Sequence, residues 1–254
     1  MVVRISTALA DPATTADHVV TIVGAEPRLA ARILQVANSA AFNASGKPLT
    51  DLKSAITRLG HQMVHGTSMS YAMLQMKNEA ALRAIAQPMS DLWRRSIAVA
   101  SICRLVARRT KANADEAFLT GLLHGIGHLY IMARAYVARD GLGDQQSWMD
   151  LLLGWQSPIG KAVLESWGFS PELCEAIGDQ NDRERRWRHE AGLSDILIAS
   201  LLLNDILNTP EPRAVTTEGV GVYATVSLDA QSAAGILGEA EQQIHLVIQA
   251  LGTG

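Results

Sequence analysis

The sequence predicts an all-α protein, and three observations support this fold class. Nearly every segment repeats its apolar residues at helical spacing, and the alternation of β-branched and polar residues that is typical of strands is almost absent. Proline, glycine or a capping residue marks the ends of most periodic segments. Of the 254 residues, 48% are hydrophobic, which is enough for one large domain or for one domain with an appendage.

The first predicted helices lie before residue 77. Pro27 opens a helix, because proline in the first turn lacks only an N–H that would be unpaired there anyway. Thr50 and Asp51 cap the next helix, which we expect to stop at Gly60. A methionine-rich helix follows, and its methionines are expected in the core; they are Met63, Met69, Met73 and Met76.

Two helices are predicted in the middle of the chain. Pro88 starts a long helix that runs to about Arg109. Asn113, with Glu116 three residues later, has the pattern of a capping box. We expect this cap to begin the helix that holds His124.

The remaining helices are predicted from caps and from periodicity. Residues 157–158 and 170–171 are both Ser-Pro, which combines an N-cap with proline at the first helical position, so each pair is expected to start a helix. A last core helix is expected over 194–207, followed by a boundary at 209–217, where two prolines interrupt the periodicity.

The chain beyond this boundary is expected to form an extension. Residues 220–226 contain valines and a tyrosine and could form a short extended piece. Two amphipathic helices are expected over 229–237 and 239–251.

Composition and charge exclude several classes of protein. Charged residues make up 19% and the net charge is −3, which gives no global reason to expect nucleic acid or an anionic membrane as the main partner. No apolar run is long enough to span a bilayer, and the N-terminus does not have the pattern of a signal peptide. Cys103 and Cys174 are isolated and are expected to be buried, reduced thiols, so we predict a cytoplasmic protein.

Five blocks of sequence, in order, resemble the signatures of the HDOD domain, a bacterial signalling relative of the HD metal hydrolases. They cover residues 27–42, 52–60, 92–96, 116–129 and 159–171. The fourth block contains the informative run Gly-Leu-Leu-His-Gly-Ile-Gly-His-Leu, in which His124 is followed by glycine. One block alone would be weak evidence, whereas five with the right order and spacing are strong evidence.

The resemblance implies an HDOD-like, two-lobed helical domain over residues 1–207. Its N-terminal helical lobe would cover 1–88 and a degenerate HD core would cover 89–207, leaving 208–254 as a linker and a C-terminal helical extension. It also implies a regulatory role, because HDOD domains commonly lack a full set of metal ligands.

Compared with an HD hydrolase, the chain keeps few of the expected metal ligands. His124 takes the first position of the His-Asp pair, and Gly125 removes the carboxylate of the second. Arg95 falls near the first histidine, and arginine cannot ligate a metal. The last acid would fall near Asn204 or Asp205, and only Asp205 could serve. The extra histidines of two-metal relatives are replaced too; their positions correspond to Gln156, Gln180 and Asn181.

These departures leave two interpretations of the old pocket. In the first, His124 is a buried, hydrogen-bonded histidine that is kept for packing. In the second, Arg95, His124 and His128 bind an anion, because a cleft that once held phosphate could still do so with arginine in place of the metal.

Residues 182–189 form the most densely charged stretch of the chain and include Trp187. The stretch is either a surface loop or a protein-binding loop, since Trp and Arg are typical anchors of interfaces. In the second case, the contact residues would be Arg183, Arg186 and Trp187.

We therefore predict a non-catalytic signal-transduction module of the bacterial cytoplasm, with no metal and no cofactor. It would act through a protein partner or a small ligand, and not through nucleic acid or a membrane. Two alternatives stay open. One is a metal-dependent phosphohydrolase with an atypical ligand set, and the other is a nucleotide or phosphate sensor that uses the vestigial pocket.

Overall fold

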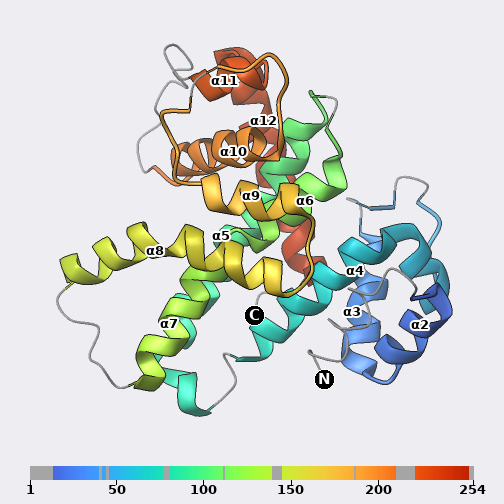
Figure 1. Ribbon diagram of the computed structural model, residues 1–254. Coiled ribbons are helices and arrows are strands. Elements are labelled where there is room, and N and C mark those ends of the chain that lie inside the picture. Colours follow the sequence, from blue (N-terminus) through green and yellow to red (C-terminus); the bar gives the residue numbers. More distant parts are fainter. Residues whose placement is uncertain are drawn as a thin grey trace.

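The computed structural model describes residues 14–39, 42–43, 46–76, 80–110, 112–138, 145–185, 187–209 and 221–251. These residues form helices joined by turns and loops, and no strand occurs among them, so the predicted all-α class is confirmed. Figure 1 shows the N-terminal helices on the right, a long central helix, and the C-terminal helices at the top.

The N-terminal helices are α2 (Ala16–Gly24), α3 (Pro27–Asn38) and α4 (Leu52–Met76), which pack on one another. Asp51 caps α4 as predicted, because its Oδ1 accepts the N–H of Ser54 at 2.8 Å. Gly60 has φ 73° and ψ 162°, so the first helical segment ends there and a second one continues directly to Met76. Met63 and Met69 are buried, in agreement with the predicted core stripe; the side chains of Met73 and Met76 lie outside the described residues.

The central helix is α5 (Ala86–Ala107), which follows the short 3₁₀ helix η1 (Ala80–Ile85). Pro88 lies in the first turn of α5, as expected. Every residue from Ser96 to Ala107 is buried, because α6, α10 and α12 all pack against α5. The helix therefore positions side chains for several neighbours at once.

The predicted helix around His124 is in fact two helices, α6 (Ala114–Leu123) and α7 (Ile126–Ala138), with a turn at His124 and Gly125. The cap at Asn113 is confirmed, because its side chain accepts the N–H groups of Asp115 and Glu116. The turn directs His124 into the space between the helices and starts α7 in a new direction.

The prediction that residues 157–158 begin a helix is wrong. Pro158 lies inside α8 (Gln145–Ser166), where it cannot donate to the carbonyl of Gly154. The helix continues because it packs along α7 and α9, and Asn181 donates to the neighbouring carbonyl of Leu153 at 2.9 Å. The second Ser-Pro pair does start a helix, α9 (Pro171–Asp179), and the side chain of Ser170 caps it.

The C-terminal part contains α10 (Leu193–Leu207), α11 (Gly221–Thr225) and α12 (Ala230–Leu251). The prediction of a short extended piece over 220–226 is wrong, since residues 221–225 are helical. The two helices expected over 229–237 and 239–251 are one helix, because Gly238 sits in open space and a single interior glycine costs only about 1 kcal/mol.

The helix α12 packs against α5, α3 and α10. It therefore contacts both of the predicted lobes, whose division at residue 88 stays a prediction. The boundary expected at 209–217 also stays a prediction, because residues 210–220 lie outside the described part of the chain. In the described part of the chain, no helix combines the length and the apolar character that crossing a membrane requires.

Candidate functional site

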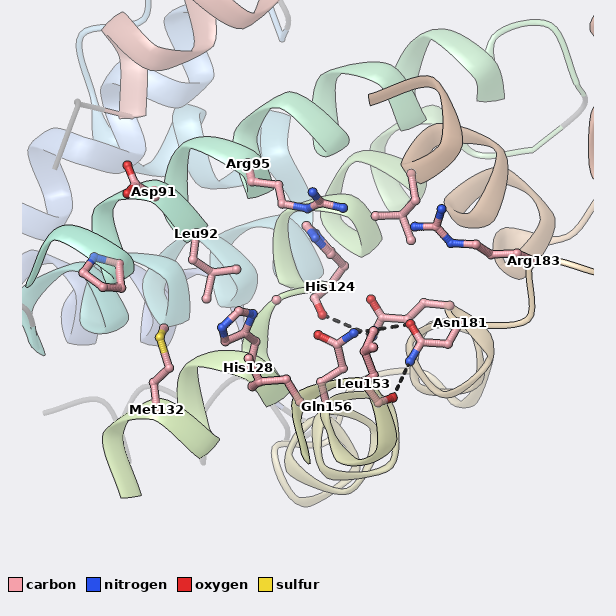
Figure 2. Close-up of a pocket in the computed structure, with 15 residues that line it drawn as sticks. Asp91, Leu92, Arg95, His124, His128, Met132, Leu153, Gln156, Asn181 and Arg183 are labelled. Atoms are coloured by element: carbon pink, nitrogen blue, oxygen red, sulfur yellow. Dashed lines mark hydrogen bonds between the residues drawn. The ribbon is translucent and has the colours of Figure 1, made fainter. Parts of the chain in front are cut away.

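A cavity of about 640 Å³ lies where α5, α7, α8, α10 and the loop after α9 meet. It brings together four residues of the predicted site: Arg95, His124, Gly125 and His128. The three amides that were predicted at the positions of the extra histidines line it as well: Gln180 and, labelled in Figure 2, Gln156 and Asn181.

His124 is buried and is fixed by a hydrogen bond within its own turn. Its Nδ1 lies 2.7 Å from the carbonyl oxygen of Gly121, which can only accept, so Nδ1 carries the proton. The pKa of His124 is lowered to about 4, mainly by burial and to a smaller extent by the charge of Arg95, while the hydrogen bond to Gly121 and the charge of Asp205 act in the opposite direction. The imidazole is therefore neutral at pH 7, and its Nε2 is free to accept.

His128, one turn into α7, lies on the opposite side of the cavity from the loop that follows α9 (Figure 2). Its pKa is lowered from the usual value, first by burial and then by the charge of Arg95. Neither histidine of the predicted anion pocket thus adds positive charge at neutral pH.

Gly125, which the sequence resemblance aligns with the acid of an HD hydrolase, has tight surroundings. A Cβ at this position would lie 2.9 Å from Cδ1 of Leu92 and 3.2 Å from Oγ of Ser96. An aspartate here would have to push α5 side chains aside before it reached the cavity.

Asp205 is shared by two arginines. Its Oδ1 lies 3.1 Å from Nη2 of Arg95 on α5, and its Oδ2 lies 2.8 Å from Nη2 of Arg183 in the loop after α9. The carboxylate thus joins three parts of the fold at the edge of the cavity. In Figure 2, the side chains of Arg95 and Arg183 extend toward each other, and His124 lies beneath Arg95.

Arg183 was predicted as part of a possible partner surface with Arg186 and Trp187. It lines the cavity and binds Asp205, but its side chain is still 53% exposed, so the partner surface stays a prediction. Arg186 lies outside the described residues, and the side chain of Trp187 is 60% exposed. No local pattern could have joined Arg183 to Asp205, because the two residues come from different elements.

The loop that carries Arg183 is held by Arg185. The guanidinium of Arg185 lies 2.8 Å from the buried carboxylate of Asp195 and 2.9 Å from that of Asp179. Because Arg185 is mostly buried, these charge-assisted contacts fix the loop more firmly than surface ion pairs would.

Amide groups close the other side of the cavity. The Nε2 of Gln180 donates to the carbonyl of His124 at 3.3 Å and to that of Ile177 at 3.0 Å. The Nε2 of Gln156 donates to Oδ1 of Asn181 at 3.3 Å (dashed lines in Figure 2). These bonds connect α8 and the end of α9 to the turn of His124.

The residues present do not fit a divalent metal ion. Among the described residues, no three side chains of the types His, Cys, Asp and Glu gather in a way that could hold one. The single nitrogen of His124 is available, but Gly125 offers no ligand and both oxygens of Asp205 are engaged by guanidinium groups.

The sequence matches the model of one protein family, described as the HDOD domain, over residues 1–183. A comparison with curated proteins gave no match.

Three solved structures share the fold. The "Putative metal-dependent phosphohydrolase" from Shewanella amazonensis SB2B is 23% identical, with a TM-score of 0.68 over 93% of this chain and 90% of the other. The "Putative phosphohydrolase" from the same organism is also 23% identical, with a TM-score of 0.67 over 99% and 93%. The "Putative signal transduction protein" from Marinobacter aquaeolei VT8 is 22% identical, with a TM-score of 0.63 over 99% of this chain and 58% of the other.

Proposed function

The chain belongs to the HDOD family, and from this we propose that it is a regulatory signalling domain that does not hydrolyse phosphate esters. The observation that carries the proposal is the ion-pair bridge Arg95–Asp205–Arg183. A guanidinium about 4 Å from a divalent ion is repelled by roughly 8 kcal/mol at an effective dielectric constant of about 20. Two such groups beside the remaining carboxylate oppose metal binding more strongly than the loss of one ligand would.

The phosphohydrolase alternative is tested directly by metal content and turnover. Purified protein is incubated with manganese, iron, nickel and zinc, desalted, analysed by mass spectrometry and assayed with bis(p-nitrophenyl) phosphate. We expect no near-stoichiometric metal and no turnover above that of a His124→Asn variant. A retained metal together with turnover that disappears in this variant would refute the proposal.

The anion-sensor alternative receives less support from the charges. Arg95 and Arg183 both face the cavity, but Asp205 already holds both guanidinium groups, and the two histidines are neutral at pH 7. A phosphate group would have to displace Asp205, and the displaced carboxylate would lose both of its partners.

We propose that the output passes to a protein partner through the exposed side of α8. Its side chains Leu151 and Trp155, which lie one turn apart on the same face, are 43% and 59% exposed, and the first half of the helix projects beyond its neighbours (Figure 1). Large apolar side chains gathered in one exposed place are typical of interaction surfaces. The two cysteines are free and buried, which supports the cytoplasm as the proposed setting.

This surface is tested with a Leu151→Ser/Trp155→Ser variant in pull-downs from the source cell, with Trp187→Ser as the matched control for an exposed tryptophan elsewhere. We expect the first variant to lose a partner that the control keeps. Retention of every partner by both variants would contradict the assignment to α8.

A further inference from the structure

A second cavity, of about 560 Å³, lies between α5, α10 and α12. It adjoins the first one, because Asp91 and Arg95 line both. Its apolar walls come from all three helices and consist of Ala98, Leu207, Ile244 and Ile248. The volume falls in the range of about 300–1,000 Å³ that is usual for small-molecule sites.

Asn204 of α10 forms the floor of this cavity. It is fully buried, and neither its Nδ2 nor its Oδ1 has a hydrogen-bond partner among the described residues. Its polar neighbours one turn away on the same helix are paired: Ser200 bonds to the carbonyl of Ile196, and Asn208 bonds to that of Asn204 itself.

An unpaired buried amide is costly. Each polar group that is buried without a partner costs about 1–3 kcal/mol, and a leucine of similar size would avoid this cost. The amide at the floor of the cavity is therefore better explained by a ligand that pairs with it than by packing.

The charges around the cavity point to an uncharged ligand. Its charged lining residues are Arg94, Arg95, Asp91 and Glu241, whose formal charges cancel. Both arginines are already engaged, Arg94 by Asp91 and Arg95 by Asp205. A phosphate or a carboxylate would find no free cation among these residues.

The amide also defines the shape of the group that it would bind. An asparagine side chain presents a donor and an acceptor side by side in one plane, and the complementary edge has an acceptor next to a donor, as in a nucleobase. Ile244 and Ile248 are one helical turn apart on α12, so they offer an apolar face against which a flat ring can lie.

We propose that this cavity binds the base of a nucleoside, with Asn204 pairing to the edge of the base. The two amide atoms are covered in this structure, so side chains that line the cavity move when the base enters. The bound base contacts α10 and α12 together, which gives the regulatory domain a small-molecule input. The role of the bound base as an input rests on the proposed regulatory function, whereas the existence of the binding site does not.

The test is calorimetric titration and thermal unfolding of the full chain with adenosine, guanosine, cytidine and uridine, each at up to about 1 mM, beside the four 5′-monophosphates. Three variants are compared with the unmodified protein. Asn204→Leu removes the amide, Ile248→Trp fills the cavity but keeps the amide, and Asn181→Leu is the matched control in the first cavity.

We expect at least one nucleoside to bind the unmodified protein and Asn181→Leu equally well, and its monophosphate to bind more weakly. Asn204→Leu should weaken binding about tenfold or more, as loss of a bidentate pair does, and Ile248→Trp should abolish it. Asn204→Leu should also unfold at a higher temperature without ligand.

The inference is overturned if none of the four nucleosides binds, if binding persists in Asn204→Leu, or if the monophosphate binds more tightly than the nucleoside. Binding that is lost in Asn181→Leu and kept in Asn204→Leu would place the ligand in the first cavity and would also overturn it. None of these outcomes affects the metal and turnover measurements, so the two proposals can fail separately.

Discussion

His124 and His65 are buried histidines that are kept neutral by the fold. Burial lowers the pKa of each from 6.5 to about 4, and His65 is stacked on Phe169 with ring centroids 4.4 Å apart. Because the unfolded chain binds protons more tightly, the stabilisation from each neutral ring is complete above about pH 6.5 and is lost as the pH falls toward 4. Each shift corresponds to roughly 3 kcal/mol.

His124→Asn should flatten this pH dependence. Asparagine keeps a donor near the carbonyl of Gly121 and does not titrate. Between pH 7 and pH 4.5, we expect the free energy of unfolding of the variant to fall by about 2 kcal/mol less than that of the unmodified protein. Urea unfolding at the two pH values measures this, and equal losses in both proteins would show that His124 is not held neutral.

Gly125→Asp should fail to restore a metal site. The new side chain meets Leu92 and Ser96, and Asp205 remains paired with two arginines. We expect a loss of about 1–3 kcal/mol of stability and no bound manganese, measured by thermal unfolding and mass spectrometry. Gly154→Asp, at an open position on α8, is the control, and a metal-binding Gly125→Asp protein of normal stability would disprove the expectation.

The contact between α7 and α8 depends on two glycines. A Cβ on Gly127 would lie 1.9 Å from the backbone oxygen of Gln156, and the backbone nitrogen of Gly160 is 2.8 Å away. The helices approach so closely only because these positions lack side chains, and the contact in turn places Gln156 and His128 on one cavity.

Gly127→Ala should therefore force α7 and α8 apart, since backbone atoms cannot move aside as a flexible side chain can. We expect a loss of about 3 kcal/mol or more. Gly238→Ala, inside α12 with open space around it, should instead gain about 0.5–1 kcal/mol. Denaturant unfolding of the pair separates crowding from helix propensity, and effects of the same sign would contradict the close approach.

The local helix signals were the most predictable part of the structure. Proline at Pro27 and the caps at Asn113 and Ser170 act within one turn, so the sequence alone shows them. At Pro158, the predicted helix start is wrong, because the packing of α8 against α7 and α9 outweighs the local signal. At Gly238, the local cost was too small to break the helix.

The candidate site was predictable only in part. The family resemblance placed Arg95, His124 and His128 together, and the cavity contains all three. The partners of Asp205 and the orphan amide of Asn204 could not be found, because they depend on how α10 lies against elements far away in the sequence. Contacts between residues far apart in the chain do not produce a repeating pattern in a single sequence, so they cannot be predicted from it.

Considered as a whole, the molecule depends on helices that lie beyond the family match. The match ends at residue 183, yet α10 supplies Asp205 and Asn204, and α12 covers α5 and α3. Four apolar side chains of α12 are buried against this surface: Ala233, Ile236, Ala240 and Val247.

A chain shortened to residues 1–209 should thus be strongly destabilised. We expect its thermal unfolding midpoint to fall by about 10 °C or more, or cooperativity to be lost, because the apolar faces of α5 and α3 become exposed. Adding a peptide of residues 221–254 should recover part of the loss. An unchanged midpoint in the shortened chain would show that α12 is an appendage and not part of the core.

The contact between α12 and α3 also has a consequence for biosynthesis. The two helices are joined by almost the whole chain, since α3 ends at Asn38 and α12 begins at Ala230. At a translation rate of about 5–20 residues per second, α3 waits roughly 10–40 s on the ribosome for its partner. During that time, the growing chain presents the apolar strip that α12 will cover, so this protein should depend on chaperones for longer than a bundle of neighbouring hairpins would.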